Sequence, residues 1–75
     1  MIKVYTTNSC PWCVKAKNYL KAKGFEYEEV NVQTDLEGRK EMLAKSNQMG
    51  VPVLDIDGTI IVGFDKPTID QALNI

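Results

Sequence analysis

The 75-residue sequence contains no histidine and only two cysteines. Without histidine, the chain cannot form a Cys–His nucleophile pair or use a histidine for acid–base catalysis. A closed zinc site needs four ligands, usually Cys or His, so a single chain with two cysteines cannot complete one. No glycine-rich phosphate-binding motif is present either. These absences exclude histidine-dependent catalysis and a zinc site closed within one chain, and no sequence motif indicates phosphate binding.

The chain also lacks a charge excess and a long apolar run. Nine basic residues face ten acidic ones, and the net charge of −1 leaves no basic surface for nucleic acid or anionic membranes. No stretch approaches the ~20 apolar residues of a membrane span. The N-terminus has no basic start followed by an apolar run, as a signal peptide would. We therefore expect a cytoplasmic protein that binds neither nucleic acid nor membrane, with residues 1–75 forming one domain.

The residue types that carry chemistry are concentrated in Cys10-Pro11-Trp12-Cys13, between a strand-like run and a helix-like run. Pro11 suits the first position of a helix, which makes Cys10 the expected N-cap. An N-cap side chain accepts a hydrogen bond from a backbone N–H of the first turn, and the helix dipole favours negative charge there. Such a setting lowers a thiol pKa from ~8.5 into the range ~3.5–7.5. Cys10 is therefore the candidate nucleophile.

Cys13 is the candidate second thiol of the pair. On a helix it shares one stripe with Ala16 and Leu20, so it should face the core beneath Cys10. The spacing of three residues brings the two sulfurs within disulfide reach. A structural disulfide and a pair of inert core thiols are the alternatives. A bridge across so short a loop removes little chain entropy, and a cytosolic C-x-x-C beside a β-α-β pattern is typical of a redox motif.

The apolar pattern predicts the element order β-α-β-α-β-β-α. Strands are expected at residues 2–6, 25–32, 51–56 and 59–63, and helices at residues 11–23, 35–46 and 66–73. The second helix should begin at a capping box formed by Thr34 and Glu37, with Leu36 and Leu43 on its apolar side. Asp57-Gly58 predicts a tight hairpin between the last two strands.

Five segments together resemble the glutaredoxin family of the thioredoxin fold, with the NrdH-type redoxins as close relatives. They are Tyr5-Thr6, the C-P-W-C motif, Gly24-Phe25, Gly50-Val51-Pro52-Val53 and Gly63-Phe64-Asp65. The resemblance runs nearly end to end. It implies an α/β fold with a four-stranded mixed sheet, in which the strands lie in the order second, first, third, fourth. The first and third helices would cover one face and the second helix the other.

The resemblance also implies the site. Cys10 and Cys13 would be the catalytic pair, and Pro52 would form a cis peptide bond beside them. The backbone of Val51 would pair with a bound peptide or glutathione. The substrate- or glutathione-binding residues would be Pro11, Trp12, Val51, Pro52, Gly63, Phe64 and Asp65, with no metal ligand. Trp12 should be exposed, whereas Tyr5 either borders the site or belongs to the core.

The reductant stays open at this stage. Glutathione-using relatives commonly carry a lysine where this chain has Thr7, and a Gly-Gly-x-Asp-Asp pattern where it has Val62-Gly63-Phe64-Asp65-Lys66. Gly63-Phe64 looks closer to the NrdH-type redoxins, which are reduced by a thioredoxin-reductase-type flavoenzyme. Asp65 could accept the glutathione ammonium, cap the last helix, or do both.

The resemblance implies a dithiol–disulfide oxidoreductase that reduces protein disulfides or mixed disulfides with glutathione. We expect a monomer with no bound cofactor, and with glutathione as a possible co-substrate. The alternative function is an iron–sulfur cluster or metal carrier that uses the same two cysteines. A third class, a redox-silent interaction module, would rely on the peptide-binding edge of the sheet alone.

Overall fold

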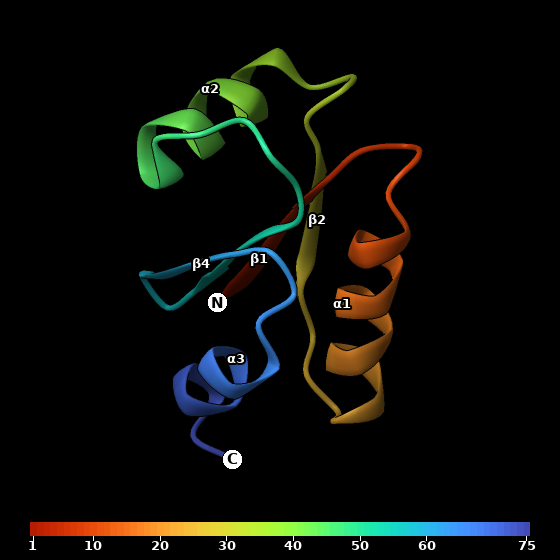
Figure 1. Ribbon diagram of the computed structural model, residues 1–75, viewed down its shortest axis with the longest axis vertical. Helices are drawn as coiled ribbons and strands as arrows, with labels where there is room; N and C mark the ends of the chain where they lie inside the picture. Colours follow the sequence, from red (N-terminus) through yellow and green to blue (C-terminus); the bar gives the residue numbers. More distant parts are fainter.

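The computed structural model describes residues 1–75 and confirms the predicted order of elements (Figure 1). In chain order the elements are β1 (Ile2–Thr6), α1 (Pro11–Ala22), β2 (Glu28–Asn31), α2 (Leu36–Ser46), β3 (Val53–Ile56), β4 (Thr59–Val62) and α3 (Lys66–Leu73). None of the three helices has the length and apolar character needed to cross a membrane.

The four strands form one mixed sheet in the order β2-β1-β3-β4, as the resemblance implied. β1 runs parallel to β2, with Tyr5 opposite Val30, and antiparallel to β3, with Val4 opposite Leu54. β3 and β4 form the predicted antiparallel hairpin. Its turn residues, Asp57 and Gly58, have φ angles of 50° and 95°, the left-handed values that a tight hairpin turn requires.

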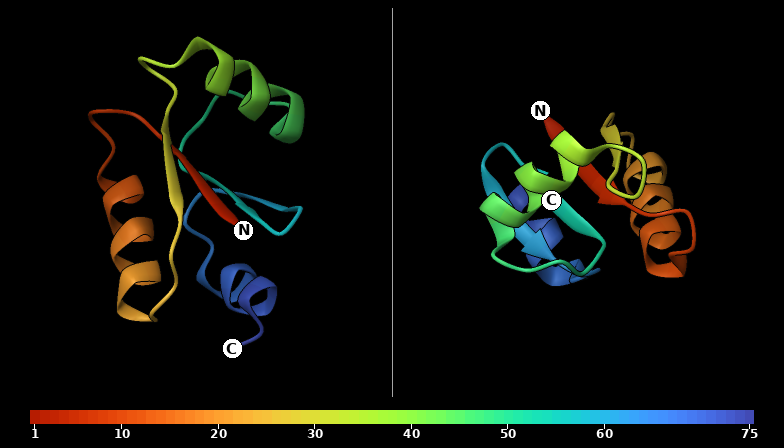
Figure 2. Two further views of the ribbon diagram at one scale, coloured as in Figure 1. Left: turned by 180° about the vertical axis from the view of Figure 1, so that it is seen from behind. Right: turned by 90° about the horizontal axis from the view of Figure 1, so that it is seen from above.

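Helices cover both faces of the sheet, so β1 and β3 are buried in the middle of three layers (Figure 2). α1 and α3 pack on one face around a cluster of eight buried apolar side chains that includes Ala16, Leu20 and Ile69. α2 packs on the other face around Tyr5, Val30, Val32, Met42 and Val53. The predicted division of the helices between the two faces is therefore confirmed.

The predicted start of α2 and its predicted apolar side are wrong. Asp35, not Thr34, is the N-cap, and its carboxylate accepts a hydrogen bond from the Gly38 N–H at 2.9 Å. Thr34 instead turns back and donates its N–H to the Asn31 carbonyl. Leu36 and Leu43 are 67% and 44% exposed, whereas the buried positions of α2 are Gly38 and Met42. The helix lies so close to β2 that a Cβ at Gly38 would overlap Cγ1 of Val30, so the smallest residue faces the sheet.

β2 is shorter than the predicted strand over residues 25–32. The N–H of Phe25 bonds to the Leu20 carbonyl at 2.9 Å and so closes the end of α1, after Gly24 has turned the chain at a φ of 82°. Phe25 and Tyr27 then pack against the core from beside the sheet. β3 likewise begins at Val53 and β4 ends at Val62, which leaves residues 51, 52 and 63 as connecting backbone.

Candidate active site

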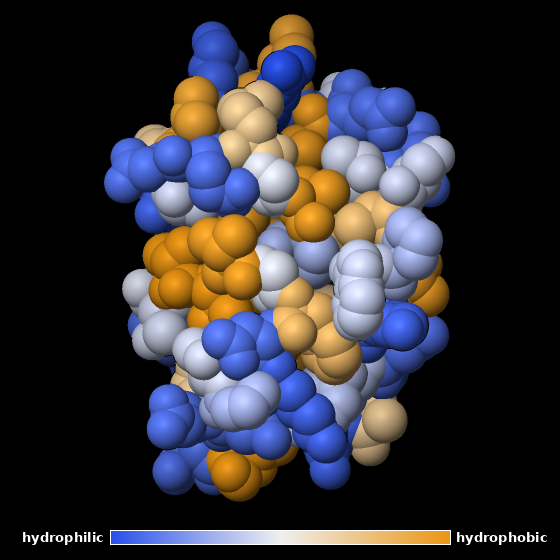
Figure 3. All heavy atoms as spheres, in the orientation of Figure 1, coloured by the Kyte–Doolittle hydropathy of each residue, from blue (hydrophilic) through white to orange (hydrophobic).

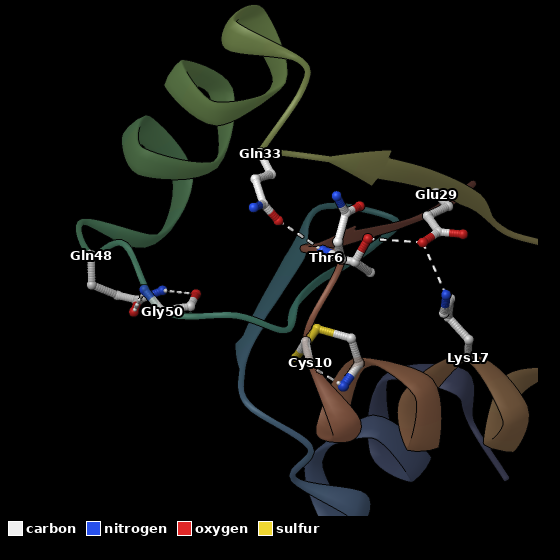
Figure 4. Close-up of a disulfide and its surroundings, with 9 residues drawn as sticks. Thr6, Cys10, Lys17, Glu29, Gln33, Gln48 and Gly50 are labelled. Atoms are coloured by element: carbon white, nitrogen blue, oxygen red, sulfur yellow. Dashed lines mark hydrogen bonds and ion pairs between the residues drawn. A yellow bond between two sulfur atoms is a disulfide. The ribbon is translucent and has the colours of Figure 1, made fainter.

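The two cysteines lie at the start of α1, just after the loop that follows β1, and they form a disulfide (Figure 4). Their Cα atoms are 5.2 Å apart. Cys10 is the N-cap of α1 with an extended backbone, and its Sγ accepts a hydrogen bond from the Cys13 N–H at 3.1 Å. Pro11 occupies the first turn, where its missing N–H leaves no unpaired donor. The predicted N-cap position of Cys10 is thereby confirmed.

Burial distinguishes the two sulfur-bearing residues. Cys13 is 1% exposed and lies on the buried stripe of α1 with Ala16 and Leu20, while Cys10 is only partly buried. The first turn of α1 contains no acidic residue, so no carboxylate opposes the positive helix terminus. The Lys15 ammonium lies 4.3 Å from the centroid of the Trp12 ring and adds positive charge to the same turn. Positive charge at a helix N-terminus favours the thiolate form of a cysteine placed there.

A shallow hollow of about 280 Å³ is lined by Trp12, Val51, Pro52, Gly63 and Phe64. These are five of the seven residues that the resemblance assigned to substrate or glutathione binding. The Val51–Pro52 peptide bond is cis, as expected. The Gly63 N–H donates to the Pro52 carbonyl at 2.7 Å, which ties the end of β4 to the cis peptide. The Trp12 and Phe64 rings lie 6.4 Å apart across the hollow.

Two apolar side chains that line the hollow or lie near its residues in sequence are accessible to solvent. Trp12 is 56% exposed, as predicted, and Met49 is 46% exposed on the segment that leads to Val51. Figure 3 shows hydrophobic atoms gathered at mid-height over the β3–β4 hairpin, with smaller hydrophobic groups elsewhere on the same face. A larger hollow of about 400 Å³ is lined by Met1, Ile2, Glu26, Tyr27 and Glu28 and includes no residue of the C-P-W-C motif. The smaller hollow includes Trp12, which lies between Pro11 and Cys13 in that motif.

Two other predicted site residues lie outside the hollow lining. Pro11 is exposed in the first turn of α1. Asp65 follows Phe64 and is the N-cap of α3, where its carboxylate accepts hydrogen bonds from the N–H and Oγ1 of Thr68 at 3.4 and 2.8 Å. Its predicted capping role is confirmed. Tyr5 is fully buried and donates its hydroxyl hydrogen to Glu41, so it belongs to the core.

A partly buried polar contact near the disulfide was not predicted from the sequence. Thr6 Oγ1 donates to a Glu29 carboxylate oxygen at 2.8 Å, and Lys17 Nζ lies 2.9 Å from the same oxygen (Figure 4). The hydrogen bonds from Lys17 and Thr6 hold the pKa of Glu29 below its usual range. The Lys17 ammonium is therefore paired with the Glu29 carboxylate on β2.

Amide side chains brace the loops on either side of the site, and Figure 4 shows two of them, Gln33 and Gln48. The Asn8 N–H donates to Gln33 Oε1 at 2.9 Å, and Asn31 Nδ2 donates to Asn8 Oδ1 at 2.6 Å. These bonds tie the loop before Cys10 to the loop after β2. Gln48 braces Gly50 in the other loop. Asn and Gln in short loops beside a motif are the only sequence signal of such bracing.

Comparisons of sequence agree with this geometry. The Glutaredoxin family profile matches residues 2–61. A glutaredoxin-like 8.6 kDa protein in the rubredoxin operon of Clostridium pasteurianum, itself uncharacterized, is 53% identical over 73 residues, which is 97% of each chain. Glutaredoxin 3 of Escherichia coli K12 is 34% identical over 64 residues, covering 85% of this chain and 77% of that protein.

Solved structures resemble the whole chain. The thioredoxin-like protein BC3987 superposes with a TM-score of 0.90 at 35% identity, covering 96% of this chain and 99% of that one. The glutaredoxin-like NrdH-redoxin of Escherichia coli superposes with a TM-score of 0.83 at 27% identity, covering 93% and 91%. Because both sulfurs are joined in one disulfide, the alternative of a cluster or metal carrier is not favoured. The chain belongs to the glutaredoxin family, and its function is thiol–disulfide oxidoreduction.

Proposed function

We propose that Cys10 is the attacking thiolate and Cys13 the resolving thiol in the reduction of protein disulfides and of mixed disulfides with glutathione. One observation carries the proposal. The Cys10 sulfur is at the N-terminus of α1 and accepts a backbone N–H, while Cys13 is buried directly behind it. The first arrangement stabilises a thiolate, and the second keeps the other thiol within reach but away from substrate.

The reaction moves two electrons from the protein to the substrate. The Cys10 thiolate attacks one substrate sulfur, a new S–S bond forms, the substrate S–S bond breaks, and the leaving thiolate takes a proton from water. Cys13 then loses its proton and attacks the Cys10 sulfur. This second exchange releases the other substrate sulfur as a thiol and produces the Cys10–Cys13 disulfide that the structure contains.

We assign substrate binding to the hollow lined by Trp12, Val51, Pro52, Gly63 and Phe64. Neither the N–H nor the carbonyl of Val51 makes a hydrogen bond within the protein. Both groups are thus available to the main chain of a peptide or to glutathione. The rings of Trp12 and Phe64 offer apolar surface around them. Pro11 and Asp65 contribute by shaping the starts of α1 and α3.

The oxidised pair must regain two electrons. Two glutathione thiols or the dithiol of a thioredoxin-reductase-type flavoenzyme can supply them. The similarity to NrdH-redoxin, whose activity profile is described as thioredoxin-like, supports the second source. The exposed Asp65 carboxylate next to the hollow supports the first. Either supply operates in a reducing compartment, so we place the monomeric protein in the cytoplasm.

A coupled assay tests the proposal. NADPH oxidation is followed with a protein disulfide as substrate, and electrons enter through glutathione with glutathione reductase or through thioredoxin reductase. We expect turnover with at least one supply, and its complete loss in Cys10→Ser. No turnover with either supply would overturn the proposal and favour a redox-silent interaction module. Turnover that survives Cys10→Ser would overturn the assignment of Cys10 as the attacking thiolate.

A further inference from the structure

The segment of residues 47–51 carries the chain from α2 to the cis peptide bond at the hollow. Asn47 caps the end of α2 with a left-handed φ of 57°, and its N–H donates to the Leu43 carbonyl at 2.8 Å. Gly50 is exposed and makes no backbone–backbone hydrogen bond. Such an exposed segment would ordinarily be mobile, yet it positions Val51.

The Gln48 side chain closes a small ring over this segment (Figure 4). Its Oε1 accepts a hydrogen bond from the Gly50 N–H at 2.5 Å, and its Nε2 donates to the Gly50 carbonyl at 3.1 Å. One amide thus occupies both backbone groups of the residue before Val51. The other Nε2 hydrogen can reach Ser46 Oγ at 3.2 Å.

Ser46 connects this ring to the body of α2. Its Oγ lies 2.7 Å from the Met42 carbonyl and 3.0 Å from the Gln48 carbonyl, and its single proton can be donated to either. Met42 is fully buried against the sheet. The Gln48 amide is therefore held, through Ser46, by the buried part of α2 at Met42.

The absence of a side chain at Gly50 leaves room for the Gln48 amide. A Cβ at position 50 would lie 2.7 Å from Gln48 Oε1, which is closer than van der Waals contact allows. The atom in the way is the end of a flexible side chain. A side chain at position 50 would therefore push the amide aside and leave the backbone where it is. Glycine is needed here so that the amide can reach the backbone.

We infer that Gln48 is a positioning residue for substrate. Its amide holds Gly50 so that the free N–H and carbonyl of Val51 are already set for pairing with the main chain of a peptide substrate. The inference rests on the proposed function, since it assumes that Val51 pairs with substrate. It predicts an effect on the binding of peptides and none on the chemistry of Cys10, because the Gln48 amide makes no hydrogen bond to either cysteine.

The test uses the reduced full-length protein and a short peptide whose single cysteine is in mixed disulfide with a small thiol. Trp12 is the only tryptophan and stands beside the cysteines, so its fluorescence reports their oxidation in stopped flow. Oxidation rates over a range of peptide concentrations give a half-saturating concentration and a maximal rate. A second substrate, dithiobisnitrobenzoate, is too small to need main-chain pairing and reports the thiolate alone.

We expect Gln48→Ala to raise the half-saturating peptide concentration about five- to tenfold, or about 1–1.4 kcal/mol at 1.4 kcal/mol per factor of ten. The maximal rate and the dithiobisnitrobenzoate rate should not change. Gln48→Glu keeps the acceptor for the Gly50 N–H but loses the donor, so its effect should be intermediate. Gln71→Ala, on the exposed face of α3, is the matched control and should behave as wild type.

Gly50→Ala supplies an independent variant. It should reproduce the effect of Gln48→Ala. The double variant should be no worse than either single one, because both changes remove the same hydrogen bonds between Gln48 and Gly50. An unchanged half-saturating concentration in Gln48→Ala, additive effects in the double variant, or a parallel loss with both substrates would overturn the inference. If wild type shows no saturation by peptide, the proposed function fails at that step, whatever the variants do, and the inference fails with it.

Discussion

The backbone N–H of Cys13 donates a hydrogen bond to the Sγ of Cys10 at 3.1 Å, so the second cysteine of the motif helps to position the sulfur of the first. The bond exists because Cys10 is an N-cap and Cys13 is three residues further along α1. The same geometry buries the Cys13 side chain to 1% exposure and leaves Cys10 partly accessible. A single helix start thus differentiates two chemically identical side chains.

The first prediction concerns the reactivity of reduced Cys10. Because the helix terminus and the Cys13 N–H stabilise negative charge, the alkylation rate should rise with a midpoint well below the ~8.5 of a free thiol, within ~3.5–7.5. The measurement is the rate of iodoacetamide modification against pH, read by mass spectrometry. The Cys10→Ser variant is the control, and its buried Cys13 should react slowly at every pH. A midpoint near that of a free thiol would show that the helix start does not activate Cys10.

The second prediction concerns the order of the two exchanges. In Cys13→Ser the first exchange proceeds but nothing resolves the product, so a mixed disulfide between Cys10 and substrate should accumulate to one per chain when glutathione is absent. Intact mass spectrometry under non-reducing conditions detects it. Cys10→Ser should form none. Equal multiple turnover by Cys13→Ser and wild type would contradict a resolving role.

The third prediction concerns acid stability. Hydrogen bonds from Tyr5 and then Lys3 hold the pKa of Glu41 at about 2, whereas an unfolded glutamate titrates near 4.3. Since the folded-state pKa is the lower one, the stabilising effect is complete above about pH 4.3 and is lost as the pH falls toward about 2. With 40% of its side chain exposed, Glu41 should contribute at most about 1 kcal/mol.

Urea unfolding at several pH values between neutral and acid measures this effect. The Glu41→Gln variant should lose stability at neutral pH and should show a shallower decline than wild type over the acid range. Glu26→Gln, which removes an exposed carboxylate that lies outside the helices and makes no ion pair, is the matched control. Parallel pH curves for wild type and Glu41→Gln would assign the acid sensitivity to other groups.

The fourth prediction concerns the packing of α2 on β2. In a solvent-exposed helix, Gly→Ala stabilises by about 1 kcal/mol. At Gly38 the added methyl group would overlap Cγ1 of Val30, so Gly38→Ala should instead destabilise by about 1–3 kcal/mol, as overpacking does. Chemical denaturation measures the change.

Two further variants separate overlap from helix propensity. Val30→Ala removes the overlapping atom, so the Gly38→Ala substitution should cost less in that background than in wild type. Lys40→Ala, on the exposed side of α2, should change the free energy of unfolding by less than about 0.5 kcal/mol. Stabilisation by Gly38→Ala in the wild-type background would mean that α2 does not approach β2 so closely.

The sequence alone was sufficient for the features that depend on near neighbours in the chain. Pro11 after Cys10 predicts a helix start, the helical stripe with Ala16 and Leu20 predicts that Cys13 is buried, and Asp57-Gly58 predicts the hairpin. Each of these is decided by local backbone conformation and helical periodicity, and the structure has all three. The similarity to glutaredoxins supplied the order of the strands and the cis bond before Pro52.

Only the tertiary structure decided which side of α2 is buried and how the loops beside the cysteines are held. The predicted apolar side, with Leu36 and Leu43, points outward because the close approach of β2 selects Gly38. Asn8 is a polar loop residue whose partners Asn31 and Gln33 are distant in the sequence, so only the fold brings them together. Hydrophobic periodicity predicts which side of a helix is buried when the helix packs at the usual distance from a sheet. It contains no information on the distance between a helix and a sheet, and that distance comes from packing of the whole chain.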